Sequence, residues 1–201
     1  MTTNNASSAT HRDTATAFGG AEPSRPARRF SPLLSASAAG IFAVGVASGL
    51  DRALNQSPVR DAHVAGTAAW TQHLILAAAG CAAYGCAVWR RRRTGQRVGR
   101  PLLLAPLGGT AAARLIATLR QVSWRTAAAL PLVGLIAYNL WRVGEQVTAG
   151  LDPNFTVNAW GGPTYLGAMA CHYLDAALLT AACAWLLGKI LLPAAHGGAD
   201  G

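Results

Sequence analysis

Charged residues are scarce in this sequence. Only 12% of the 201 residues are Asp, Glu, Lys or Arg, about half the share in a typical globular protein. Hydrophobic residues make up 52%. They gather in uncharged runs of about twenty residues, the length that crosses the hydrocarbon core of a bilayer. The sequence therefore predicts a membrane protein and excludes a soluble globular domain.

Motifs for catalysis and metal binding are also missing. The chain has no nucleophile elbow, phosphate-binding loop, dinucleotide-binding glycine pattern or H-E-x-x-H, so none of those reaction types is indicated. Its four cysteines form no C-x-x-C pair and lie inside apolar runs, which argues against a disulfide framework or a zinc site. These cysteines are Cys81, Cys86, Cys171 and Cys183. We expect a protein that is not an enzyme.

Short alternating segments, typical of membrane β-strands, are absent as well. Because lipid offers the backbone no hydrogen-bond partners, the apolar runs are expected to be helical. The predicted fold class is all-α, a polytopic membrane helix bundle with four transmembrane helices and one interfacial amphipathic helix. Residues 1–30 are expected to form a disordered cytoplasmic tail and residues 194–201 a flexible C-terminal tail. Within the transmembrane domain 31–193, the spans are expected at about 31–50, 64–89, 126–145 and 163–190.

The segment between the second and third spans is open to two interpretations. Pro106 and the glycines after it interrupt its apolar run. A further span over 101–119 would bury Arg114 in lipid. The alternative is a helix in the interface with a polar stripe at i, i+4, i+7 and i+11, formed by Arg114, Thr118, Gln121 and Arg125. We favour the interfacial helix.

Basic residues outnumber acidic ones, 17 to 8, and give a net charge of +9. From Arg25 onward, in the four-span arrangement, thirteen of them fall on the side of the termini and three on the other side, which predicts cytoplasmic termini. Arg, Ala and Gly are abundant, which indicates a bacterial chain in the cytoplasmic (inner) membrane. The arginine run follows a span directly, so contact with anionic lipid headgroups is expected rather than nucleic-acid binding. The headgroup candidates are Arg90, Arg91, Arg92, Arg93, Arg114, Arg120 and Arg125.

Three ionisable side chains lie inside the expected spans. His73 and His172 are each nine residues from the expected start of their span, which places both near the bilayer middle, and Asp175 shares a helix face with His172. A buried polar cluster that joins two helices is the interpretation we favour. The alternatives are a haem b or metal site with both histidines as ligands, and a proton or ion path through His172 and Asp175.

Two further patterns concern contacts between helices. Gly45 and Gly49 have G-x-x-x-G spacing, which predicts a close helix contact. At the expected outer rim, charges are predicted to satisfy one another, Asp51 with the adjacent Arg52 and Arg142 with Glu145 three residues on. Taken together, these features suggest a structural or accessory subunit of a membrane complex. Other membrane subunits or a second copy are the expected partners, and no cofactor is expected.

Overall fold

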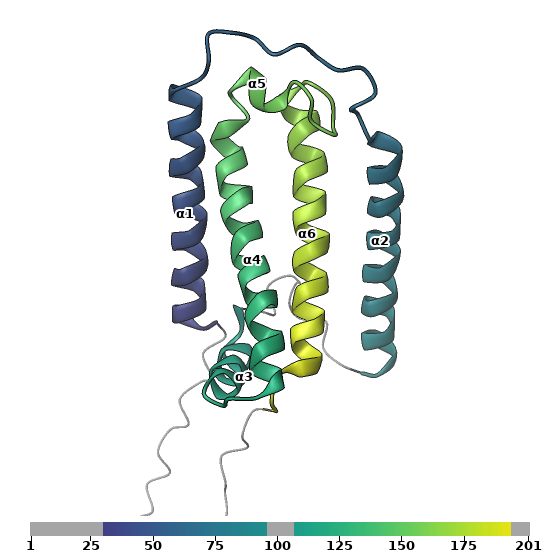
Figure 1. Ribbon diagram of the computed structural model, residues 1–201. Coiled ribbons are helices and arrows are strands. Elements are labelled where there is room, and N and C mark those ends of the chain that lie inside the picture. The colour runs from purple at the N-terminus through teal and green to yellow at the C-terminus, as the bar shows by residue number, and fades with distance from the viewer. Residues whose placement is uncertain (1–29, 96–106, 194–201) are drawn as a thin grey trace, which may run out of the picture.

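The computed structural model describes residues 30–95 and 107–193 and shows an all-α protein (Figure 1). Four helices are long and apolar enough to cross a membrane, so the predicted fold class, an all-α membrane helix bundle, is confirmed. The two predicted tails lie outside the described residues, apart from Phe30. The long helices are α1 (Pro32–Leu54), α2 (Trp70–Arg93), α4 (Trp124–Ala149) and α6 (Tyr165–Ile190), and the short ones are α3 (Gly109–Leu119) and α5 (Pro153–Thr156).

The long helices stand side by side in the order α1, α4, α6, α2 (Figure 1). The contact between α1 and α4 is the most extensive, that between α4 and α6 is smaller, and α2 packs lightly on α6. Helix α5 and the α1–α2 connection lie at one end of the row and α3 at the other. We call these the α5 end and the α3 end.

Glycine allows the backbones of α1 and α4 to touch. Gly45 and Gly49 on α1 and Gly144 on α4 lie so close to the facing helix that an added Cβ on any of the three would overlap one of its backbone carbonyls. The Thr148 hydroxyl donates a hydrogen bond of 2.9 Å across this contact to the carbonyl of Val46. The predicted contact through the G-x-x-x-G pair is therefore confirmed.

Helix α3 is too short to span a bilayer. Its 11 residues cover about 16 Å, against the roughly 30 Å of a hydrocarbon core. It lies across the end of the row, near the start of α4 (Figure 1). Ser123 caps α4 by accepting from the amide of Thr126, so the two helices are separate.

The break at Ser123 divides the predicted polar stripe between two helices, and its two arginines, Arg114 on α3 and Arg125 on α4, face the end of α6. Arg114 donates from Nε to the carbonyl of Leu192 at 2.8 Å and from Nη2 to those of Gly188 and Leu191, and Arg125 donates to the carbonyl of Ile190 at 2.8 Å. A helix end leaves its last carbonyls without partners, and the guanidinium groups supply them. These two side chains therefore bind the end of α6. Headgroup contact remains a prediction for these arginines, as it does for Arg90–Arg93 and Arg120.

The glycine contact gives a matched pair of substitutions. Gly45→Ala should lower the stability of the folded state by about 1–3 kcal/mol, because the facing carbonyl belongs to a packed backbone and cannot yield cheaply. Gly40→Ala on the same helix meets nothing within 4 Å and should leave stability unchanged or slightly raised. Reversible unfolding in mixed micelles, followed by circular dichroism, measures both. Equal effects of the two substitutions would contradict the contact.

Candidate functional site

The second long helix starts later than the sequence predicts, at Trp70 rather than Val64. Gly66 takes a positive φ of 84°, and the amides before the helix bond elsewhere, that of Val64 to the side chain of Asn158 and that of Ala69 to the carbonyl of Trp160. The segment is therefore a connection held at the α5 end and not the first turn of a span.

This late start places His73 in the first turn of its helix. His73 lies three residues after the first residue of α2, and His172 seven after that of α6. At 1.5 Å per residue these are distances of about 4.5 and 10 Å from the helix starts. His73 nevertheless contacts Asp175, one turn beyond His172 on α6, so the two histidines lie at a similar level, and a position near the bilayer middle stays a prediction. Both belong to the α5-end half of the protein.

His73 makes two hydrogen-bond contacts, one with the residue directly before α2 and one with α6. Its Nδ1 lies 2.7 Å from the carbonyl oxygen of Ala69, and its Nε2 lies 3.2 Å from Oδ2 of Asp175 on α6. The imidazole is buried, whereas the Asp175 side chain is about one third exposed. The sequence places Asp175 beside His172, three residues away, but its hydrogen bond is to His73. A long-range partner on another helix is not visible in helical spacing.

Trp160, in the loop before α6, lies between the two histidines. Its ring centroid is 5.8 Å from that of His73 and 6.2 Å from that of His172. A tight turn places it there, because Gly161 packs so closely on Gly167 of α6 that a Cβ on either would overlap the other's carbonyl. The three predicted cluster residues therefore do lie together, with Trp160 as a fourth member that the sequence does not reveal.

Phe155 repeats this arrangement on the other side of the loop. The Arg52 guanidinium of α1 lies 5.2 Å from the centre of its ring and that of Arg142 of α4 lies 5.7 Å away, within cation–π range. The two loop aromatics thus each lie between basic groups from two different helices. Together they connect all four long helices at the α5 end.

The rim charges pair only partly as predicted. Arg142 and Glu145 form an ion pair, as their spacing predicts, and Glu145 is buried. Arg52 does not pair with Asp51 but faces Asp152 of the loop, with 3.9 Å between Nε and Oδ2. Asp51 accepts instead from the side chain of Asn55 at 3.0 Å. The correction follows from helix geometry, because adjacent residues on a helix point in different directions.

Two asparagines fasten the α1–α2 connection to this loop. Asn154 accepts from the amide of Asp61 at 3.0 Å and donates to the carbonyl of Val59 at 2.7 Å. Asn158 does the same one turn later, with the amide of Val64 at 2.8 Å and the carbonyl of Ala62 at 3.4 Å. Each asparagine side chain therefore accepts from one backbone amide and donates to one backbone carbonyl of the connection, as a peptide group of a neighbouring β-strand would.

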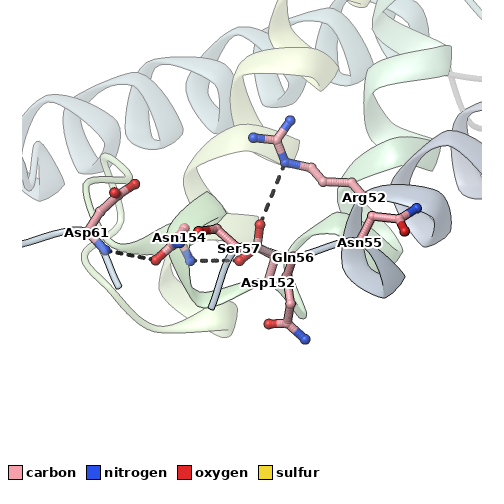
Figure 2. A pocket seen from close by; sticks show the side chains of 7 residues that line it. All are labelled: Arg52, Asn55, Gln56, Ser57, Asp61, Asp152 and Asn154. Carbon is pink, nitrogen blue, oxygen red and sulfur yellow. Dashed lines mark hydrogen bonds and ion pairs between the residues drawn. The ribbon is translucent and has the colours of Figure 1, made fainter. Parts of the chain in front are cut away.

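A pocket of about 390 Å³ opens beside these contacts (Figure 2). Figure 2 shows Arg52 turned toward Asp152, and Asp61 on the far side of Asn154. Binding sites for small molecules are usually lined mainly by apolar groups, but here every lining residue is polar or charged: Arg52, Asn55, Gln56, Ser57, Asp61, Asp152 and Asn154. The pocket is a solvated surface between two connections.

A haem or metal bound by both histidines stays a prediction. In this structure Nε2 of His73 lies 3.2 Å from Oδ2 of Asp175, and the Trp160 ring is the aromatic neighbour of both imidazoles. Within residues 30–95 and 107–193, no three His, Cys, Asp or Glu side chains gather as a metal site.

Fold and site together define a four-span helical membrane protein with a polar and aromatic cluster at one end. In comparisons with protein-family models, curated proteins and solved structures, nothing matches the chain.

The asparagine contacts predict a local effect on hydrogen exchange. Asn154→Ala should speed exchange of the Asp61 amide, and Asn158→Ala that of the Val64 amide, each by roughly fivefold for a hydrogen bond of about 1 kcal/mol. Exchange followed by NMR in micelles resolves the two amides, and each variant is the control for the other. Unchanged rates at both amides would show that the connection is held in another way.

Proposed function

We propose that this protein is a non-enzymatic subunit of a larger membrane assembly, in which α2 contacts another membrane-spanning helix. The observation that carries the proposal is the exposure of α2. Of its 24 residues only His73 is buried, and its main contact within the chain is the light one with α6. A span packed on one side offers its remaining faces to lipid or to a partner.

The composition of the free face supports a protein partner. Ala78, Ala82 and Cys86 follow one another at four-residue spacing, with Cys81 and Gly85 beside them, and all five are exposed. Small residues at this spacing allow close approach of helices in lipid. A Cβ on Gly85 would meet nothing within 4 Å in the chain itself, so nothing internal accounts for this glycine.

A proton or ion path through His172 and Asp175 is less well supported. Polar contacts between α4 and α6 continue inward as far as Asn139, whose amide lies 3.5 Å from the hydroxyl of Thr180. Beyond that point an apolar cluster of Ala129, Leu187 and Leu191 fills the α3-end half, with Leu115, Leu132, Val133 and Ile136 packed around it. A path would need polar groups or water in this half.

Substitutions at two exposed glycines, Gly85 on α2 and Gly134 on α4, test whether α2 contacts another membrane-spanning helix. In native membranes, a benzophenone maleimide attached to Cys81 and Cys86 should, on illumination, give a species larger than the monomer, because both thiols are exposed whereas Cys171 and Cys183 are buried. Gly85→Leu should abolish that species. Gly134→Leu, at an equally open position on α4, should leave it intact. Absence of any cross-linked species, or equal loss in both variants, would count against the proposal.

We also propose that the α3 end faces the cytoplasm of a bacterial inner membrane. Among the described residues, the α5 end has three basic residues, Arg52, Arg60 and Arg142, and such an imbalance sets topology. Three α3-end cations lie over tryptophan rings, with Arg93 4.1 Å from the ring centre of Trp89, as interfacial aromatic residues do. The basic residues of the α3 end number eight: Arg90, Arg91, Arg92, Arg93, Arg114, Arg120, Arg125 and Lys189.

Thiol labelling tests this orientation. In a chain whose four native cysteines are replaced by alanine, Ser57→Cys should react with an impermeant maleimide added to intact cells. Thr94→Cys should react only after the membrane is opened. Both positions are exposed in the structure, so access differs only by side of the membrane. The reverse labelling pattern would invert the topology.

A further inference from the structure

The two hydrogen bonds of His73 cannot both form when the imidazole is neutral and Asp175 is ionised, because that pair is one proton short. A backbone carbonyl only accepts, so Nδ1 must donate to Ala69 across 2.7 Å. The Nε2 atom then faces Oδ2 of Asp175 at 3.2 Å. If His73 is neutral and Asp175 is ionised, two lone pairs face each other there. If the imidazole proton is on Nε2 instead, the lone pair of Nδ1 faces the carbonyl oxygen of Ala69, which also only accepts.

One dissociable proton removes the conflict. It makes either an imidazolium beside a carboxylate or a neutral imidazole beside a carboxylic acid, and both forms place a hydrogen between Nε2 and Oδ2. Within the described residues, this is the one side-chain hydrogen bond or ion pair that joins α2 to α6. The geometry points to a proton-dependent latch: a proton bound between His73 and Asp175 holds α2 against α6 at the α5 end, and its loss frees that end of the helix.

The other groups around the latch are few. From α6, the His172 ring lies 6.2 Å from that of Trp160, which in turn lies 5.8 Å from His73, and Cys171 is buried one turn before Asp175. The loop contributes Trp160, which does not titrate, and α2 has no acidic or basic residue before Arg90 other than His73. The latch acts within one chain, whether or not α2 contacts a partner. Farther along α2, Leu178 of α6 lies against Gly80 without a hydrogen bond.

The position of α2 can be measured against α1, which is fixed to α4 by the glycine contact. A spin label on Leu74→Cys, in the first turn of α2, and a second on Val44→Cys of α1 are both exposed, and the two helices stand at opposite ends of the row (Figure 1). The four native cysteines are replaced by alanine. Pulsed electron resonance in lipid nanodiscs then gives the distance distribution at about pH 5 and about pH 9, on either side of the range in which imidazole titrates. We expect a broader or shifted distribution at the higher pH.

Three variants separate the latch from its surroundings. Asp175→Asn supplies an amide N–H to neutral His73 and loses the dissociable proton, so its distribution should stay narrow at both pH values. His73→Leu cannot form either hydrogen bond and should give the broad distribution at both. His172→Gln, the matched control, should keep the pH response of the parent chain. Circular dichroism and gel filtration establish that each variant is folded, and Asp175→Asn alone decides the matter if His73→Leu is not.

Two results would overturn the latch. One is a parent distribution that is the same at both pH values. The other is a pH response that survives in Asp175→Asn but disappears in His172→Gln, which would make His172 the sensor. A pH response present in the parent and in His172→Gln, and absent from Asp175→Asn, establishes it.

Discussion

Helices in lipid gain nothing from hiding apolar surface from one another, because lipid tails are as apolar as their side chains. They associate through close backbone contact and through polar groups that find partners. Both means are used here, at different places. Glycine brings α1 onto α4 along their length, whereas α2 has polar and aromatic contacts at its first turn and one close glycine contact beyond it. This difference makes α1 and α4 a rigid pair and α2 an outer element.

The loop between α4 and α6 compensates for the weak lateral packing. Phe155 touches cations from α1 and α4, and Trp160 touches imidazoles from α2 and α6. Aromatic rings suit this task at a membrane boundary, because they combine a large apolar surface with a face that attracts cations. The α1–α2 connection is tied to the same loop by Asn154 and Asn158. The α5 end is therefore one connected cap, and the placement of α2 depends on it.

The sequence predicts features that depend on residues close together in the chain, and it misses contacts between residues that are far apart in the chain. The number of spans, the G-x-x-x-G contact and the Arg142–Glu145 pair follow from local spacing, and the structure has all three. The start of α2 is misjudged because Val64–Ala69 is apolar enough for a helix, yet its amides bond to a loop about ninety residues away. The partner of Asp175 and the role of Trp160 are missed for the same reason. Arg114 shows a related limit, since a polar stripe defines a face but does not tell whether headgroups or helix carbonyls lie opposite.

The free energy of a single hydrogen bond limits how far a proton can shift the position of α2. Hydrogen bonds between membrane helices contribute about 0.6 kcal/mol on average and at most about 1.7. A latch of that strength changes the ratio of attached to detached α2 by roughly three- to eighteenfold, which is enough to shift the position of α2 measurably. Contact along the small-residue face of a partner helix could outweigh it. Because His73 and Ala78 face different sides of α2, a partner and α6 need not compete for the same surface. A proton at His73 would then bias the orientation in which α2 presents its free face.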